Sequence, residues 1–300
     1  MDLAERIVEF VGGASMEVTS HDRETRQELI GRLAEGTTVY VAHTPNSTVA
    51  DVADVACEVE SEGFRACPHI VARRIRNERE LENALARMQK SGIKRALLVA
   101  GDQTPPLGTF ASSLDLLESG LLAEHGFCML GVAGYPEGHQ HIADAVLRDA
   151  LAQKQRFADR SGADLYVVTQ FSFDAAAIVD WVRQLDGHGI RLPVHAGIMG
   201  PATIGTLIRY ARLCGIGKSL RALTNRVAEP GLLRGLTTSA EEILVHIVRE
   251  GQGEHAGRIV QPHFFSFGGV ARTARWLQAL RNGDFDVDPR AGRLAVHTAA

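Results

Sequence analysis

The chain has 300 residues and a formal net charge of −4, with 45% hydrophobic and 23% charged residues. This composition predicts a packed globular fold rather than disorder, and it provides no basic field that would attract nucleic acid. The N-terminus lacks the basic start and apolar run of a secretory signal, and no run of about 18 apolar residues could span a membrane. We therefore expect a cytoplasmic protein that binds neither nucleic acid nor a membrane. The sequence leaves its oligomeric state open, a homo-oligomer included.

Short apolar runs alternate with helical patterns along the whole chain. Residues 47–63 carry valines three or four positions apart, with Ser47 as the expected N-cap, and residues 78–92 show the same helical spacing. The helical segments end at glycines, which enter the left-handed conformation at little cost. These glycines are Gly36, Gly63, Gly92, Gly126, Gly162 and Gly189. The predicted strands are residues 14–18, 38–43, 65–70, 95–100, 127–133, 164–170, 193–198 and 259–265.

The strand-like runs are almost continuously apolar, which indicates a parallel sheet covered by helices on its faces. Eight such units predict an α/β protein whose residues 1–300 form one domain, a (β/α)8 TIM barrel. The alternative is an open doubly wound sheet, but its usual glycine-rich turn does not follow the first strand. Residues 216–258 exceed what one unit needs and predict a helical elaboration. The chain after about residue 284 is expected to be a C-terminal extension.

In a barrel of this kind, the active site lies at the carboxyl ends of the strands. The residues there include Glu17, His43, His69, Gly101, Asp102, Ala133, Tyr135, His139, Gln170, Met199 and His263. Glu17 stands inside an apolar strand, where burial would raise the pKa of its carboxyl group and suit it to act as a general acid. Asp102 follows an apolar run directly and receives the same interpretation. The four cysteines form no CxxC or CxxH pair, so we expect no metal site.

Nine short motifs occur along the chain in an order that is typical of one family. They are "SMEV" (15–18), "CPHI" (67–70), "AGD" (100–102), "FASSLDLL" (110–117), "VAGYPEGH" (132–139), "TQFSFD" (169–174), "GIMGPAT" (197–203), "RYARLCGIG" (209–217) and "PHFFSF" (262–267). In these residues the sequence resembles the methylenetetrahydrofolate reductase family. The resemblance extends from about residue 14 to residue 267, which is most of the chain.

The resemblance implies an oxidoreductase that reduces 5,10-methylenetetrahydrofolate to 5-methyltetrahydrofolate. The sequence leaves open whether this reaction serves methionine biosynthesis or the catabolism of methyl groups. Hydride would come from NADH or NADPH and pass through FAD. By the same resemblance, Glu17 and Asp102 are catalytic, and folate is bound by Asp102, Gln170, Phe171 and Met199. The implied flavin contacts are His43, His69, Gly101, Phe110, Ala111, Ala133, Tyr135, His139 and Lys154.

The chemistry agrees with these residue types. The methylene bridge must open to an iminium before it accepts hydride, and opening needs a proton on the departing nitrogen, which a buried glutamic acid can supply. The amide of Gln170 offers both a donor and an acceptor to the edge of the pterin. The carboxylate of Asp102 can favour the cationic iminium electrostatically.

One departure from the family pattern concerns the flavin. Family members often carry arginine where this chain has Ala100, and losing that guanidinium removes a bidentate phosphate partner. Arg148, Lys154 and Arg156 are candidates to compensate, whereas the arginines of residues 71–76 are interpreted as a solvated face. Two alternatives stay open: direct hydride transfer from NADH without flavin, and a folate-binding methyltransferase component without redox activity.

Overall fold

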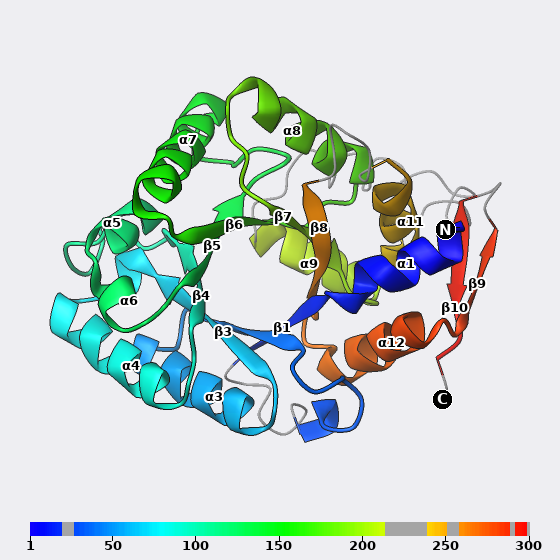
Figure 1. Cartoon of the computed structure of the whole chain (residues 1–300), viewed down its shortest axis with the longest axis horizontal. Helices are drawn as coiled ribbons and strands as arrows, with labels where there is room; N and C mark the ends of the chain where they lie inside the picture. Colours follow the sequence, from blue (N-terminus) through cyan, green and yellow to red (C-terminus); the bar gives the residue numbers. More distant parts are fainter. Residues whose placement is uncertain (20–26, 214–238, 251–257, 289–291, 299–300) are drawn as a thin grey trace.

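Eight parallel strands, β1 to β8, close into a barrel in sequence order, with helices around the outside (Figure 1). The computed structural model describes residues 1–19, 27–213, 239–250, 258–288 and 292–298. The strands are β1 (Ser15–Thr19), β2 (Thr38–Ala42), β3 (Arg65–Val71), β4 (Arg95–Val99), β5 (Met129–Gly134), β6 (Asp164–Thr169), β7 (Val194–Met199) and β8 (Ile259–Phe265). The predicted (β/α)8 fold is confirmed, and every predicted strand is present within two residues of its expected ends.

Helices fill the segments between the strands. They are α1 (Leu3–Gly12), α3 (Val49–Ser61), α4 (Glu78–Lys90), α5 (Ser113–Glu118), α6 (Leu121–Glu124), α7 (Asp144–Ser161), α8 (Ala175–Gly187), α9 (Ile204–Leu213), α11 (Ala240–Glu250) and α12 (Val270–Asn282), with short 3-10 turns η1 (Gln27–Leu29) and η2 (Ala72–Arg74). In the part of the chain that the structure describes, no helix is both long and apolar enough to cross a membrane.

The local signals in the sequence mostly hold. All six glycines expected to end helices have positive φ, between 69° and 89°, because this conformation lets the chain leave a helix at little cost. The N-cap of α3 was predicted one residue too early. Thr48 caps the helix by accepting a hydrogen bond from the N–H of Asp51, whereas the hydroxyl of Ser47 donates to the carbonyl of Thr44 within the preceding loop.

The two ends of the chain lie on the same side of the barrel. After α12, strands β9 (Phe285–Asp288) and β10 (Arg293–Val296) form a separate antiparallel pair, and β10 packs beside α11 (Figure 1). This pair occupies the segment expected to be a C-terminal extension. Of the predicted helical elaboration, α11 is described, while residues 216–238 and 251–257 lie outside the described residues.

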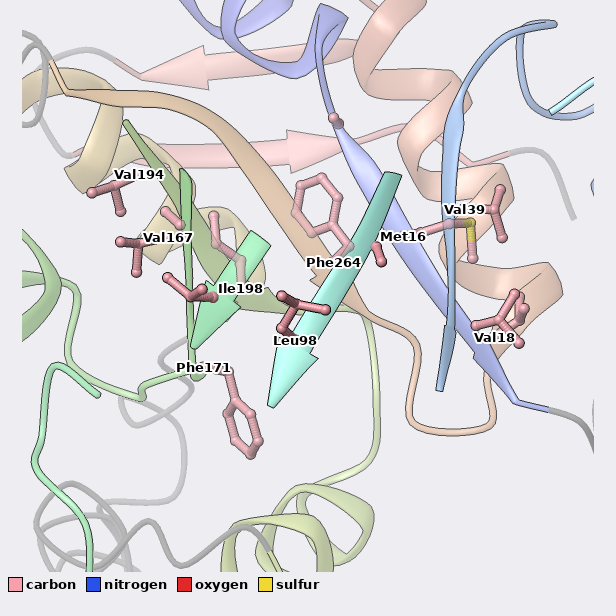
Figure 2. Close-up of a cluster of buried hydrophobic side chains, with 14 of the residues drawn as sticks. Met16, Val18, Val39, Leu98, Val167, Phe171, Val194, Ile198 and Phe264 are labelled. Carbon is pink, nitrogen blue, oxygen red and sulfur yellow. The ribbon is translucent and has the colours of Figure 1, made fainter. Parts of the chain in front are cut away.

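Each barrel strand has two different faces. The outward side chains are apolar and pack under the helices in one continuous core. Figure 2 shows part of this core, including Met16, Val18, Val39, Leu98, Val167, Val194, Ile198 and Phe264. The inward side chains form a second, smaller cluster of Tyr40, Cys67, Leu97, Tyr166 and Val168. The interior therefore contains polar groups where barrels of this kind usually place branched apolar residues.

Gly197 of β7 shows how tightly the interior is packed. A Cβ atom at this position would lie 2.2 Å from the carbonyl oxygen of Thr169 and 2.9 Å from the ring of Phe265. We expect G197A to lower the free energy of unfolding by about 1–3 kcal/mol, because backbone and ring must move to admit the methyl group. Urea unfolding measures this difference.

G187A in α8 is the matched control, because a Cβ there meets nothing within 4 Å. Replacing a helical glycine by alanine should leave the stability unchanged or raise it by about 0.5–1 kcal/mol. Equal stabilities of the two variants would contradict this account of the interior.

Candidate active site

Two predicted site residues meet inside the barrel. The Oε2 atom of Glu17 on β1 lies 3.5 Å from Nε2 of His69 on β3, and the two side chains are 19% and 14% exposed. Burial and the nearby His43 lower the pKa of His69 to about 3, so the ring is neutral at physiological pH. The contact therefore joins a carboxyl group to a neutral imidazole and is not an ion pair.

A polar network lies next to this pair, and of its residues only His263 was expected at this end of the barrel. The rings of Tyr40 and His263 are 4.3 Å apart between centroids, and Nδ1 of His263 is 3.0 Å from the hydroxyl of Ser15. The hydroxyl groups of Tyr40 and Tyr166 form a hydrogen bond of 3.0 Å. Burial keeps the pKa of His263 well below its usual value. The alternation of inward and outward positions along each strand would have indicated these residues.

Asp102 does not match its prediction as a buried acid. Its side chain is 81% exposed, and Oδ1 accepts a hydrogen bond of 2.9 Å from Nη2 of Arg74. This bond is the main reason that the pKa of Asp102 is lowered, so the group stays ionised. The correction has a simple cause, because the strand ends at Val99 and Asp102 lies on the loop beyond it.

Arg74 was also interpreted wrongly, as part of a solvated face. Its side chain is only 14% exposed, and besides Asp102 it donates to the carbonyl of Thr44 at 2.7 Å. Arg73 lies nearby and holds Ala100 through a backbone hydrogen bond of 3.0 Å. Two arginines of the turn η2 thus contact the segment that contains Ala100, the position where the family often has its own arginine.

A third group of predicted residues lines a pocket of about 250 Å³ between α7 and α8. Ala133, Tyr135 and Lys154 contribute to its walls, together with Arg148 and Trp181. Lys154 is only 8% exposed, and burial lowers its pKa to about 8. Among the described residues, its ammonium group has no hydrogen-bond or ion-pair partner. An unpaired buried cation indicates a place where an anionic group binds.

The remaining predicted residues are not all available to a ligand. Phe110, Phe171 and Met199 are 4%, 1% and 1% exposed, so their side chains offer almost no surface. Phe171 packs against an aromatic cluster, with the ring of Phe267 at 4.8 Å, and points away from the barrel strands in Figure 2. These three side chains therefore support the site by packing rather than by offering surface to a ligand.

The polar and small residues of the predicted set lie around the mouth. The backbone N–H of Gln170 donates to the carbonyl of Gly134, and its side-chain oxygen accepts from the N–H of Phe171 at 3.1 Å. Nε2 of His43 is 3.0 Å from the carbonyl of Ser47. The ring of His139 packs edge-on against Tyr135. Ala111 is exposed, and Gly101 has a φ of +88° with no room for a Cβ beside Val71.

A barrel with a carboxyl–imidazole pair inside its mouth and cations at the rim has the layout of an enzyme active site. Comparison with known proteins identifies the family. The model of the family "Methylenetetrahydrofolate reductase" matches residues 19–230, which is more than half of the chain. The protein belongs to the methylenetetrahydrofolate reductase family.

The curated relatives are distant and much longer. Methylenetetrahydrofolate reductase 2 of Saccharomyces cerevisiae is 26% identical over 50% of this chain and 26% of its own length. Methylenetetrahydrofolate reductase 1 of Schizosaccharomyces pombe is 26% identical over 67% of this chain and 33% of its own length. Methylenetetrahydrofolate reductase (NADH) 1 of Zea mays is 32% identical over 45% of this chain and 25% of its own length. The chain thus spans about a quarter to a third of these relatives.

The neutral state of His69 has a consequence for stability. Between pH 6.5 and about 3, the ring binds a proton in the unfolded chain and not in the folded one, so stability falls as the pH falls through this window. Each such proton contributes a slope of about 1.4 kcal/mol per pH unit. We expect H69Q to flatten the pH dependence of the free energy of unfolding between pH 6 and 5 by up to this amount.

Urea unfolding at several pH values checks the slope, whatever the overall stability of the variant. H297Q controls for the loss of a histidine outside the barrel, since the side chain of His297 is 58% exposed. An unchanged slope for H69Q would show that His69 is protonated in the folded protein.

Proposed function

We propose that the protein reduces 5,10-methylenetetrahydrofolate to 5-methyltetrahydrofolate with hydride from a nicotinamide nucleotide. The observation that carries this proposal is the contact between Glu17 and His69 inside the barrel of a chain that belongs to the methylenetetrahydrofolate reductase family. A carboxyl group in such partial burial can hold a proton and release it to a bound substrate. NADH is the expected donor, since the Zea mays relative carries NADH in its name.

In this proposal Glu17 protonates the departing nitrogen of the methylene bridge, directly or through a water molecule. The opened bridge is an iminium cation that then accepts hydride. The neutral ring of His69, 3.5 Å from the carboxyl oxygen, adds no positive charge beside Glu17 that would favour loss of a proton.

Asp102 and Gln170 are proposed to bind the pterin at the rim. Asp102 remains ionised beside Arg74, so it can stabilise the positive charge of the iminium. A second hydrogen bond, to the carbonyl of Thr44, holds the Arg74 side chain in place. Arg74 in turn fixes the position of the Asp102 carboxylate. The Arg74 side chain is thus proposed to position Asp102 rather than to contact the reacting atoms.

The pocket around Lys154 fits an anionic part of FAD, such as its diphosphate. Its unpaired ammonium group and the neighbouring Arg148 supply positive charge, and Tyr135 supplies an aromatic wall. The volume of about 250 Å³ accommodates only part of so large a cofactor. When bound, FAD would accept hydride from the nicotinamide and deliver it to the folate.

A second route, direct hydride transfer from the nicotinamide without flavin, is favoured by a different observation. Ala100 supplies no guanidinium, and the arginine nearest to Asp102 is already engaged by that carboxylate and by Thr44. In this route the same proton donor and the same folate contacts operate. The nucleotide would occupy the mouth together with the folate.

The role of Glu17 is tested by E17Q, which keeps the shape of the side chain and removes its proton. We expect kcat for folate-dependent NADH oxidation to fall by about 10²- to 10⁴-fold, while the affinity for methylenetetrahydrofolate changes little. E9Q, an exposed position on α1, is the control and should match the wild type. Undiminished turnover of E17Q would refute the assigned role.

A wild-type protein that binds folate but never oxidises NADH would favour the methyltransferase alternative.

The visible absorption spectrum of the purified protein, before and after incubation with FAD and desalting, tests the flavin route. We expect retained FAD, and we expect K154M to bind it about tenfold more weakly or worse, because the ammonium group that would bind the diphosphate is lost. R156M is the control, since Arg156 is exposed on the same helix and does not line the pocket. A colourless protein that refuses FAD but oxidises NADH in the presence of methylenetetrahydrofolate would establish the direct route instead.

A further inference from the structure

A second cavity opens at the opposite end of the barrel from the candidate active site. Its wall is formed by the first residues of successive strands, among them Thr38, Arg65, Arg95 and Asp164, and its volume is about 590 Å³. We call it the lower cavity. Its size is in the range of sites that hold small organic molecules.

Three arginines give the lower cavity its character. Arg65 and Arg95 begin β3 and β4, and Arg281 reaches the cavity from α12. Within the described ranges, none of these guanidinium groups has a carboxylate at ion-pair distance. Two carboxylates, Glu35 and Asp164, also line the cavity, which leaves one formal positive charge in excess.

Arg95 is half-buried, yet the described residues satisfy its guanidinium group only weakly. Its described partners are the hydroxyl of Thr38, at the long distance of 3.5 Å, and the sulfur of Met129 at 3.2 Å, a weak acceptor. A guanidinium group has five donors. Arg95 also acts on the barrel interior. Burial raises the pKa of the Cys67 thiol to about 12, and the positive charge of Arg95 opposes that rise.

Arg281 differs, because its donors are already used. It bonds to the hydroxyl of Thr37 at 2.8 Å and to the carbonyls of Ala14 and Val11 at 3.0 and 3.2 Å. These neutral acceptors hold the guanidinium in place without cancelling its charge. Arg281 therefore contributes a fixed positive potential to the cavity, while Arg65 and Arg95 keep donors that no described residue occupies and that a ligand could use.

The inner end of the cavity is aromatic and uncharged. Tyr166 and His195 stack there with ring centroids 4.2 Å apart. Nδ1 of His195 is 3.4 Å from the side-chain nitrogen of Gln261. A ligand would thus meet cations at the opening and a flat polar wall inside, which suits a small organic molecule with an acidic group.

We propose that the lower cavity is a second binding site, for a small organic anion that carries a phosphate or a carboxylate group. The cations that begin β3 and β4 would hold the oxyanion. This site is independent of the folate chemistry proposed for the opposite end, so either proposal can fail without the other.

The test is calorimetric titration of the full chain at low ionic strength with inorganic phosphate and, separately, with succinate. We expect at least one of these anions to bind at a single lower-cavity site, and R95M to weaken its binding by about tenfold or more. R95K, which keeps the charge, should retain part of the affinity. Whichever anion binds more tightly identifies the acidic group that the site prefers.

Two controls separate this site from other cations. K154M should leave the Arg95-dependent binding unchanged, because Lys154 lies in the pocket between α7 and α8. R87M should do the same, since Arg87 pairs with Asp54 on the outside of the barrel. If R95M does not fold, as judged by circular dichroism, R65M at the exposed opening replaces it. The proposal is overturned if neither anion binds the wild type, or if the arginine variants bind as tightly as the wild type.

Discussion

Closure of the barrel between β1 and β8 is the constraint on which the rest of the structure depends. The described pairing is short, with Ser15 opposite His263 and Met16 opposite Phe264. It is reinforced inside the barrel by the hydrogen bond between the Ser15 hydroxyl and His263. Only a closed sheet places the last strand beside the first two, so that the ring of His263 on β8 packs against Tyr40 on β2. The polar network next to the carboxyl–imidazole pair therefore depends on closure.

The alternation of side chains along the strands divides the molecule into an apolar layer and a polar interior. The outward residues exclude water between sheet and helices and supply most of the hydrophobic stabilisation. The inward residues include phenols, imidazoles and a thiol, several of which contact one another through hydrogen bonds and ring packing. Burial keeps the imidazoles neutral, so the interior remains polar without carrying charge. Charge is confined to its two ends, with carboxylates and cations at the mouth and arginines at the lower cavity.

The fold could be predicted closely, whereas the site was predicted only in part. Apolar runs and helix-ending glycines report on local backbone preferences, so the strand ends agree within two residues. Glu17 was correctly expected inside the barrel, since a carboxylate in the middle of an apolar strand has few other places to lie. Asp102 was misjudged because its loop turns it toward solvent. Arg74 was misjudged because the sequence of an arginine run is the same whether its side chains face solvent or pair with a carboxylate such as Asp102.

By itself, the sequence determined the order of strands and helices, the closed parallel barrel and the membership of the methylenetetrahydrofolate reductase family, because periodicity and motifs are local properties. Only the tertiary structure decided which polar residues meet. It brought Lys154 from α7 beside the loop after β5, paired Arg74 with Asp102 across two strand ends, and gathered the arginines that begin β3 and β4 at one opening. The physical reason is that each of these contacts joins residues far apart in the chain. Their distances depend on strand register and loop direction, which no local pattern encodes.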